Sequence, residues 1–193
     1  FTFSTLLFLI SVIKKKTQSK YRKKRSNRYF FYLGCAFGFG FFLVGNYWIS
    51  ISLTHDEVFK FLIPFSIILI PFFLSLFFGL AILITGPFCE KNFYYVLFFA
   101  LIFSIFEFLR GSLLTGFPWN LISYSLSWSI ETIQILSFIG TYSLSLVSIT
   151  FFCSPFFLLQ KKPKKKNFIV LTILIIILVG NYVYGSNKIK KTI

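Results

Sequence analysis

Glu107 is one of only five acidic residues in the chain, and it lies within a run of Phe, Leu and Ile. Arg110 follows three residues later, which places the two side chains on the same face of a helix. A charged side chain in hydrocarbon costs about 2.5–3.5 kcal/mol on insertion scales, so such residues are normally paired or functional. Two interpretations are open: a buried ion pair that fixes a helix end, or a contact with a lipid headgroup or carbonyl group at the outer membrane surface.

The residues after this charged pair read GSLLTGFPWN. Gly116 permits a backbone angle that most residues avoid, and Pro118 fixes its own. Phe117 and Trp119 have side chains that suit a membrane–water interface. The segment therefore predicts a re-entrant or interfacial loop on the outer face.

The remaining residues that could do chemistry show weaker patterns. His55 and Asp56, with serines nearby, hint at a Ser-His-Asp hydrolase, but neighbours in sequence are poorly placed to orient one another, so a solvated loop fits better. The cysteines lie in or beside apolar segments without pairing or metal-ligand spacing. We expect the side chains of Cys35, Cys89 and Cys153 to be buried, and we expect neither a metal nor a cofactor.

The composition indicates what kind of elements hold these residues. Hydrophobic residues make up 56% of the 193 positions and charged residues 13%, whereas soluble domains average roughly 45–50% apolar and 25% charged residues. This composition is that of a membrane protein. The net charge of +15 gathers in clusters between apolar runs instead of covering a soluble face, so we expect no nucleic-acid partner.

Apolar segments long enough to cross a bilayer recur along the chain. A hydrocarbon core of about 30 Å needs roughly 20 apolar residues in a helix, because lipid offers no partners to backbone polar groups. Barrels would need short alternating strands instead. The sequence predicts an all-α, polytopic transmembrane helix bundle with about five full helices and one, residues 1–13, truncated at the N-terminus. The full helices are residues 29–53, 61–86, 92–113, 133–159 and 167–185.

The loop charges assign the sides of the membrane. Lys and Arg are enriched in cytoplasmic loops, and here they concentrate in residues 14–28 and 160–167. Because each span changes sides, residues 86–92 are also expected inside. The loop that contains Phe117 and the C-terminus are then expected outside.

Small residues predict where helices approach one another. Gly34 and Gly38 form a GxxxG pattern, with Gly45 seven residues further on, so this stripe favours close packing of a second helix.

Helical spacing also orients the charged pair. Ser104, Glu107 and Gly111 share one face, which we expect to point into the bundle. Phe106 and Leu109, on the opposite side, are expected to face lipid.

The segment EFLRGSLLTGFPWN, followed by SYS, resembles the signature of bacterial apolipoprotein N-acyltransferases, a series of Glu-x-Leu-Arg-Gly, Thr-Gly-Phe-Pro-Trp and Gly-Tyr-Ser. Ser123 stands where the family usually has Gly. Weaker likenesses cover residues 38–52, 139–146 and 188–193. The matching signature positions are Glu107, Leu109, Arg110, Gly111, Thr115, Gly116, Phe117, Pro118, Trp119, Tyr124 and Ser125.

The resemblance implies a function in lipoprotein maturation. Such proteins hold a nitrilase-like α/β domain outside the bacterial cytoplasmic (inner) membrane, where a Glu-Lys-Cys triad takes an acyl chain from a phospholipid as a thioester. The acyl group is then transferred to the N-terminal amine of a diacylglyceryl-cysteine. The implied partners are a phospholipid acyl donor, a diacylglyceryl apolipoprotein acceptor and membrane lipids, and the implied protein is multi-pass with an extracytoplasmic C-terminus.

The triad has no counterpart in these residues, so we expect no catalytic residue in this chain and no activity from it alone. Residues 1–186 are expected to form the transmembrane domain and residues 187–193 to begin the nitrilase-like domain. The resemblance further implies that the signature lines or shapes the opening through which lipid reaches the thiol. The expected substrate-binding residues are Glu107, Arg110, Gly116, Phe117, Pro118, Trp119 and Tyr124.

Two other classes stay open from the residues alone. A transporter or channel subunit could use Glu107 and Arg110 as an intramembrane relay, but it would favour several ionisable residues on facing helices or internal repeats, which the sequence lacks. A non-enzymatic membrane scaffold could bind anionic lipid through residues 14–28.

Overall fold

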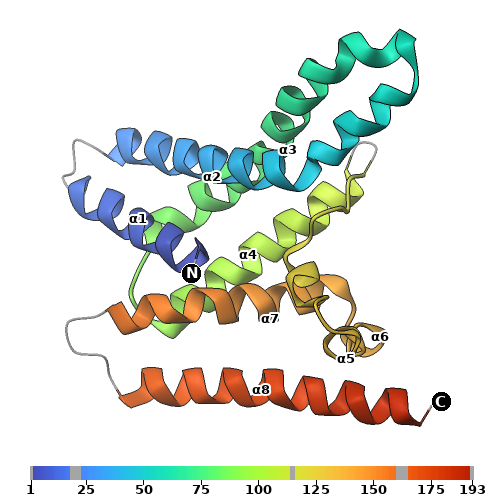
Figure 1. The fold of residues 1–193 in the computed structure, drawn as a ribbon. Helices are drawn as coiled ribbons and strands as arrows, with labels where there is room; N and C mark the ends of the chain where they lie inside the picture. The colour runs from blue at the N-terminus through green and yellow to red at the C-terminus, as the bar shows by residue number, and fades with distance from the viewer. Residues whose placement is uncertain (1, 18–22, 114–115, 160–164, 192–193) are drawn as a thin grey trace. The chain divides into compact units, whose positions relative to one another are not determined.

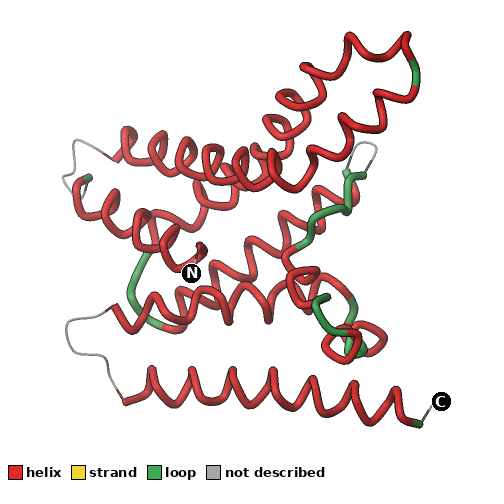
Figure 2. Tube along the Cα trace, in the orientation of Figure 1, coloured by secondary structure: helices red, strands yellow, loops and turns green. Residues whose placement is uncertain are grey.

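A computed structural model of the chain describes residues 2–17, 23–113, 116–159 and 165–191, and these residues form helices joined by short connections (Figures 1 and 2). The all-α fold class is confirmed. The α-helices are α1 (Thr2–Lys16), α2 (Lys23–Ser52), α3 (Ile63–Thr85), α4 (Phe93–Ser112), α5 (Ile130–Ile133), α6 (Leu136–Ile139), α7 (Thr141–Cys153) and α8 (Lys165–Lys190). The 3-10 helices are η2 (Leu53–His55), η3 (Glu57–Leu62), η4 (Gly86–Phe88), η5 (Ile122–Leu126) and η6 (Ser154–Leu159).

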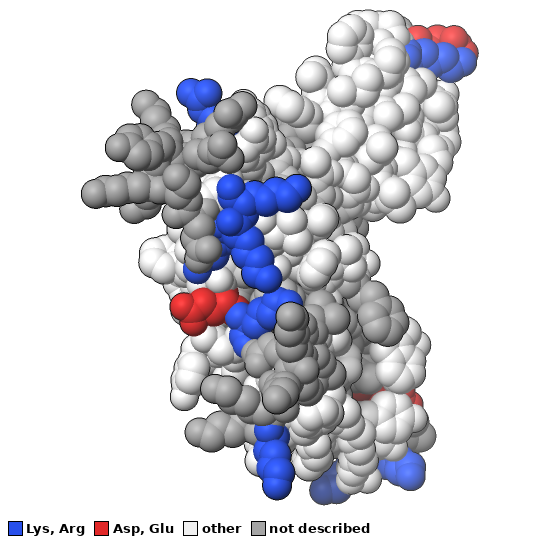
Figure 3. Space-filling model, turned by 90° about the vertical axis from the view of Figure 1, so that its left-hand side faces the viewer, with Lys and Arg blue, Asp and Glu red and all other residues white. Residues whose placement is uncertain are grey.

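Within the described residues, four helical segments are long and apolar enough to cross a membrane: Ser26–His55, Glu57–Phe88, Phe93–Ser112 and Asn167–Lys190. The protein is therefore a helical membrane protein. Among the described residues, most of the surface in Figure 3 belongs to neither acidic nor basic side chains, as a surface in contact with lipid requires.

The fifth expected span, residues 133–159, differs from the single helix that its composition predicts. It begins as the short helices α5 and α6, and Gly140 then takes a φ of 76° before α7 starts. A residue with positive φ cannot continue a right-handed helix, so the chain changes direction there. The shorter apolar helix Thr141–Phe156 follows.

The contacts divide the chain into two compact units. One, called here the α7–α8 unit, contains Phe1–Phe8, Glu90–Ile105 and Leu121–Ile193. The other, the α2–α3 unit, contains Leu9–Cys89 and Phe106–Asn120.

The α2–α3 unit is built on a close glycine contact between its two long helices. A Cβ atom at Gly34 would lie 2.7 Å from the Cα of Gly79, and one at Gly38 would lie 2.9 Å from the Cβ of Phe78. The close approach expected from the GxxxG pattern is confirmed. The ring of Phe78 also packs on three rings of α2 with centroid separations of 5.0–6.1 Å: Phe37, Phe41 and Phe42.

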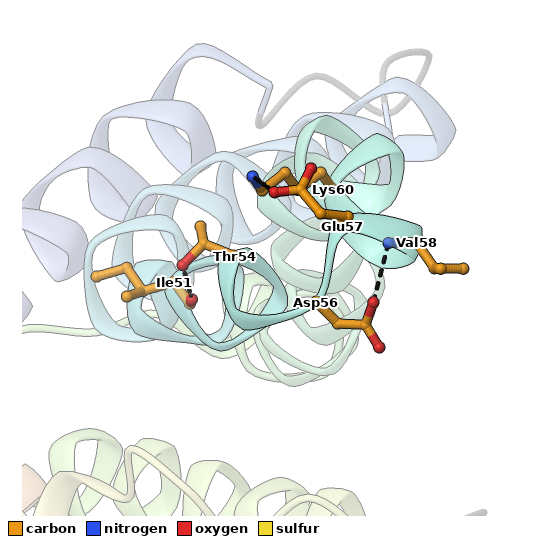
Figure 4. Close-up of polar contacts among 6 residues, drawn as sticks. All are labelled: Ile51, Thr54, Asp56, Glu57, Val58 and Lys60. Atoms are coloured by element: carbon orange, nitrogen blue, oxygen red, sulfur yellow. Dashed lines mark hydrogen bonds and ion pairs between the residues drawn. The ribbon is translucent and has the colours of Figure 1, made fainter.

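The turn between α2 and α3 is a capped connection (Figure 4). The Asp56 carboxylate accepts a hydrogen bond from the Val58 amide at 3.0 Å and so caps η3, while Glu57 and Lys60 form an ion pair one turn apart. The hydroxyls of Ser50 and Ser52 donate to backbone carbonyls three residues before them. These local bonds are those of helix ends: where a solvated loop was expected, His55 ends η2 and Asp56 links η2 to η3.

The α7–α8 unit is held by aromatic packing and by side-chain bonds between distant segments. Phe103 packs against Phe99 at 5.1 Å and against Phe3 at 5.6 Å between ring centroids. The Ser4 hydroxyl donates to the Phe152 carbonyl at 2.8 Å, which joins the start of α1 to α7.

Candidate functional site

Arg110 lies in the last turn of α4 and is only 2% exposed. Its guanidinium Nη1 donates to the carbonyl oxygens of Phe117 at 3.0 Å and Trp119 at 2.7 Å. Its own carbonyl oxygen accepts a hydrogen bond from the Phe117 amide at 3.0 Å. Arg110 therefore fixes residues 116–120, called here the signature loop, from both its backbone and its side chain, and hydrogen bonds from a charged donor are the stronger kind.

The same guanidinium lies over an aromatic ring of α2. The Arg110 Cζ is 4.9 Å from the ring centroid of Phe42, which is fully buried. A cation over a ring face contributes about 0.5–2 kcal/mol, more when it is desolvated. The positive charge in this apolar setting is thus shared between two carbonyl dipoles and an aromatic face.

The signature loop needs two residues with positive φ. Gly116 has a φ of 66°, and a Cβ there would lie 2.7 Å from the Gly111 carbonyl oxygen, so only glycine fits. Asn120 has a φ of 55°, which Asn tolerates better than most residues. The unusual backbone angle expected at Gly116 is confirmed.

One face of α2 receives the end of this loop. The Asn120 side chain donates to the Asn46 side-chain oxygen, and a Cβ at Gly45 would lie 2.7 Å from the Asn120 Nδ2. The indole of Trp119 meets that of Trp48 edge to face, with centroids 5.9 Å apart. Gly45 leaves the space that Asn120 occupies, so the third glycine of the stripe receives a loop and not another helix.

Glu107 is buried as expected, with 1% of its surface exposed, one turn before Arg110 on α4. Ser104 is buried as well, so this face of α4 is the inward one. The prediction that Phe106 and Leu109 face lipid was wrong by one position, because both are half-buried. The exposed side chains are those of the residues just before them, Ile105 and Phe108. The ion pair between Glu107 and Arg110 stays a prediction.

The other expected site residues fall in different places. Pro118 and Trp119 are exposed, Trp119 by 56%, and Phe117 is half-buried. Tyr124 lies in η5 of the α7–α8 unit and is 44% exposed. Thr115 lies outside the described residues.

Ser123, at the position where the family pattern has Gly, is buried in η5, and its amide donates to the Ser145 hydroxyl of α7 at 3.2 Å. The departure from the pattern therefore falls on a packed position of the α7–α8 unit.

Four residues that hold the signature loop were not singled out from the sequence: Phe42, Asn46, Trp48 and Asn120. Three of them lie on α2 near Gly45, where Phe42 and Asn46, four residues apart, share one helix face and Trp48 projects from another. The unexplained third glycine was the available signal, because a glycine in a membrane helix often marks a close backbone approach.

The signature loop combines exposed side chains with a backbone that is held in place. The signature loop, GFPWN, contains no thiol, hydroxyl or amine side chain. Among the described residues, no group of three or more His, Cys, Asp or Glu side chains could hold a metal ion. The loop instead offers an exposed Pro and Trp on a backbone that Arg110 and α2 keep in place.

Comparisons with known proteins give the site a context. The model of a family described as the apolipoprotein N-acyltransferase N-terminal domain matches residues 1–154. Among the similar curated proteins are three named apolipoprotein N-acyltransferase. That of Rickettsia prowazekii is 38% identical over 81% of this chain, that of Rickettsia typhi 34% over 98%, and that of Rhodopseudomonas palustris 33% over 81%. The aligned regions are 32%, 36% and 30% of those proteins, so the chain spans about a third of their length.

Proposed function

Because the chain belongs to the apolipoprotein N-acyltransferase N-terminal domain family, we propose that it is the membrane part of an enzyme of lipoprotein maturation. The enzyme would move a fatty acyl chain from a phospholipid to the N-terminal diacylglyceryl-cysteine of an apolipoprotein. The observation that carries this proposal is the signature loop, whose two carbonyls are held by the buried Arg110.

The roles of the site residues follow from their exposure. Pro118, Trp119 and Tyr124 are exposed and would contact the acyl chain or glycerol region of a lipid substrate. Trp and Tyr suit this level of a membrane because each combines an apolar ring with a polar tip. Phe117 would contact substrate with the exposed part of its ring.

The buried members would keep these groups in place. Arg110 holds the loop backbone, Gly116 permits its turn, and Glu107 would balance the Arg110 charge within the bundle. A site that must orient a flexible lipid gains from a rigid support, because a displacement of about 1 Å can lower a rate by 10²-fold.

The chemistry itself would take place outside this chain. Residues 1–186 would form the transmembrane domain, and residues 187–193 would lead into an extracytoplasmic nitrilase-like domain that supplies the thiol, the base and the lysine. The chain alone would have no transferase activity, because it would supply the platform and the lipid opening only.

Contacts within each unit support the proposed topology. Lys14 donates to the Cys89 carbonyl at 2.9 Å, so the start of the basic segment 14–28 and the segment around Cys89 would lie on the same side of the membrane. Lys91 lies 5.8 Å from the ring centroid of Phe156, just before the basic segment 160–167. These three segments would face the cytoplasm of a bacterium, in its inner membrane, and the C-terminus would lie outside.

The test is acyl transfer by the whole protein encoded by the gene that contains this chain. The protein would be placed in phosphatidylglycerol vesicles with a diacylglyceryl-cysteine peptide, and the peptide mass measured over time. The expected result is a mass increase of one acyl group. The proposal would be overturned in favour of a transporter by a protein that is folded in the vesicles but transfers no acyl group. Such a protein would be inactive in phosphatidylethanolamine vesicles as well, and it would carry ions across the bilayer.

A further inference from the structure

A cleft of about 480 Å³ lies within the α7–α8 unit and takes no part in the function proposed above. Its walls come from α7, from α8 and from the segment that contains η5 and α5. This volume is within the roughly 300–1,000 Å³ of small-molecule sites. The signature loop belongs to the other unit, and none of its residues lines the cleft.

The cleft is present because α8 is held near its two ends. Close to the C-terminal end, Gly185 packs on α5 so tightly that a Cβ would lie 1.9 Å from the Glu131 carbonyl oxygen. At the other end α8 contacts η6. Between these contacts the apolar side chains of α7 and α8 face the cleft: Phe151, Phe152, Leu178 and Val179.

A second set of lining residues is polar or amphipathic. Asn181 is 6% exposed, and its Nδ2 donates to the Thr132 carbonyl at 2.8 Å. Its Oδ1 has no hydrogen-bond donor among the described residues. Trp128 stacks on Tyr182 with an interplanar angle of 7° and a centroid separation of 6.5 Å, and both rings are exposed. This combination of an amide and two interfacial aromatic rings is typical of the headgroup level of a membrane.

Neither water nor an empty space fits this cleft. A water molecule needs two to four polar partners, and five of the ten described side chains around the cleft are hydrocarbon. A void between helices forfeits the dispersion contacts of the atoms that line it. The medium around α8, an apolar membrane helix, supplies acyl chains at high concentration.

We infer that this cleft holds one acyl chain of a resident phospholipid of the outer leaflet. The chain lies against Phe151, Phe152 and Leu178, and the glycerol ester region lies beside Asn181 and the Trp128–Tyr182 pair. No cysteine, lysine or carboxylate is among the described lining residues, so the lipid is bound without reaction and stabilises the packing of α7 and α8.

The test uses the fluorescence of Trp128 in the full 193-residue chain. The protein is placed in vesicles of phosphatidylglycerol that contain increasing mole fractions of phosphatidylglycerol brominated on its acyl chains, which quenches nearby Trp. The Trp128→Phe variant identifies the Trp128 contribution. Two substitutions fill the cleft, Leu178→Phe and Val179→Phe, and Ile176→Phe is the matched control on an exposed face of α8.

The expected result is a Trp128 component that saturates at a low mole fraction of brominated lipid, is lost in both cleft-filling variants and is kept in Ile176→Phe. Native mass spectrometry of the unaltered protein should also retain one phospholipid per chain. Quenching that only rises in proportion to mole fraction shows exchangeable boundary lipid and overturns the inference. A saturable component that remains in the cleft-filling variants also overturns the inference. So does a saturable component that brominated stearic acid both reproduces and displaces. These readouts need no transferase activity, so the inference and the proposed function fail independently.

Discussion

Arg110 and Trp119, nine residues apart, are joined by a hydrogen bond of 2.7 Å from the guanidinium Nη1 to the Trp119 carbonyl oxygen. The same nitrogen donates to the Phe117 carbonyl, so one buried side chain sets the path of the signature loop. The Trp119 ring is left exposed and rests against Trp48 of α2. The loop is therefore presented by the helices and does not hold its shape by its own contacts alone.

Replacing Arg110 should release the signature loop. Arg110→Gln cannot span both carbonyls or lie over Phe42 as a cation, and hydrogen bonds to a charged group contribute about 1.5–3 kcal/mol each. We expect a loss of about 2–3 kcal/mol in the free energy of unfolding, measured by titration with sodium dodecyl sulfate in mixed micelles. Arg28→Gln, at an exposed position, is the control and should be within about 0.5 kcal/mol of the native protein. Equal stability of the two variants would contradict the role given to Arg110.

Gly116 should not tolerate a side chain. Gly116→Ala combines a φ of 66° with a Cβ contact of 2.7 Å to the Gly111 carbonyl oxygen, and strained backbone positions cost about 1–3 kcal/mol. The expected result is lower stability and a red shift of Trp119 fluorescence. Gly180→Ala is the control, because that glycine lies in α8 with open space around it and should gain about 0.5–1 kcal/mol. A Gly116→Ala protein as stable as Gly180→Ala would exclude the observed turn.

The α2–α3 contact predicts a contrast within one helix. At Gly34 a Cβ would meet the backbone of Gly79, whereas at Gly40 it would meet nothing within 4 Å. Gly34→Ala should therefore lower the free energy of unfolding by about 1–3 kcal/mol, the usual cost of overpacking, and Gly40→Ala should not. The measurement is the same micelle titration, and the prediction is wrong if the two substitutions have equal effects.

Glu131 provides a pH-dependent test at the start of α5. The Ser129 hydroxyl donates to its carboxylate, and this bond, with a backbone hydrogen bond, lowers the pKa of Glu131 below the usual value. Because the folded-state pKa is the lower one, the stabilisation is present above the unfolded-state pKa and is lost as the pH falls through the folded-state pKa.

Ser129→Ala should move the pKa of Glu131 upward, toward its ordinary value, and reduce this acid sensitivity, because the backbone hydrogen bond remains. The measurement is a carbon-13 carboxyl titration by NMR of the protein in micelles. Ser127→Ala is the control, since the Ser127 hydroxyl bonds the Tyr124 carbonyl instead. A Glu131 pKa that is unchanged by Ser129→Ala would contradict the assignment.

The fold class and most helix positions could be predicted from the sequence because bilayer thickness dictates the length of an apolar run. The residue pairs Gly34 and Gly38, and Glu107 and Arg110, were recognised as buried because small or charged residues have few other uses in a membrane helix. The division of residues 133–159 at Gly140 was missed, since hydropathy reports burial in lipid and is blind to a positive φ.

The supports of the signature loop could not be predicted for a different reason. Asn46 and Trp48 are more than 70 residues from Asn120 and Trp119 in sequence, and nothing local requires those pairs to meet. Only the packed chain shows that Gly45 opens the space for Asn120. The motif drew attention to the signature loop, and the structure adds the residues of α2 and α4 that hold it in place.

The most direct test of the central claim is acyl transfer by the whole protein with Arg110→Gln, compared with Arg28→Gln and with the unaltered sequence at equal membrane abundance. If Arg110 positions the signature loop for a lipid substrate, the rate of transfer from phosphatidylglycerol to a diacylglyceryl-cysteine peptide should fall about tenfold or more in Arg110→Gln only, since 1.4 kcal/mol of lost positioning is a factor of ten. Equal rates in all three proteins would contradict the claim that this loop serves the transfer reaction.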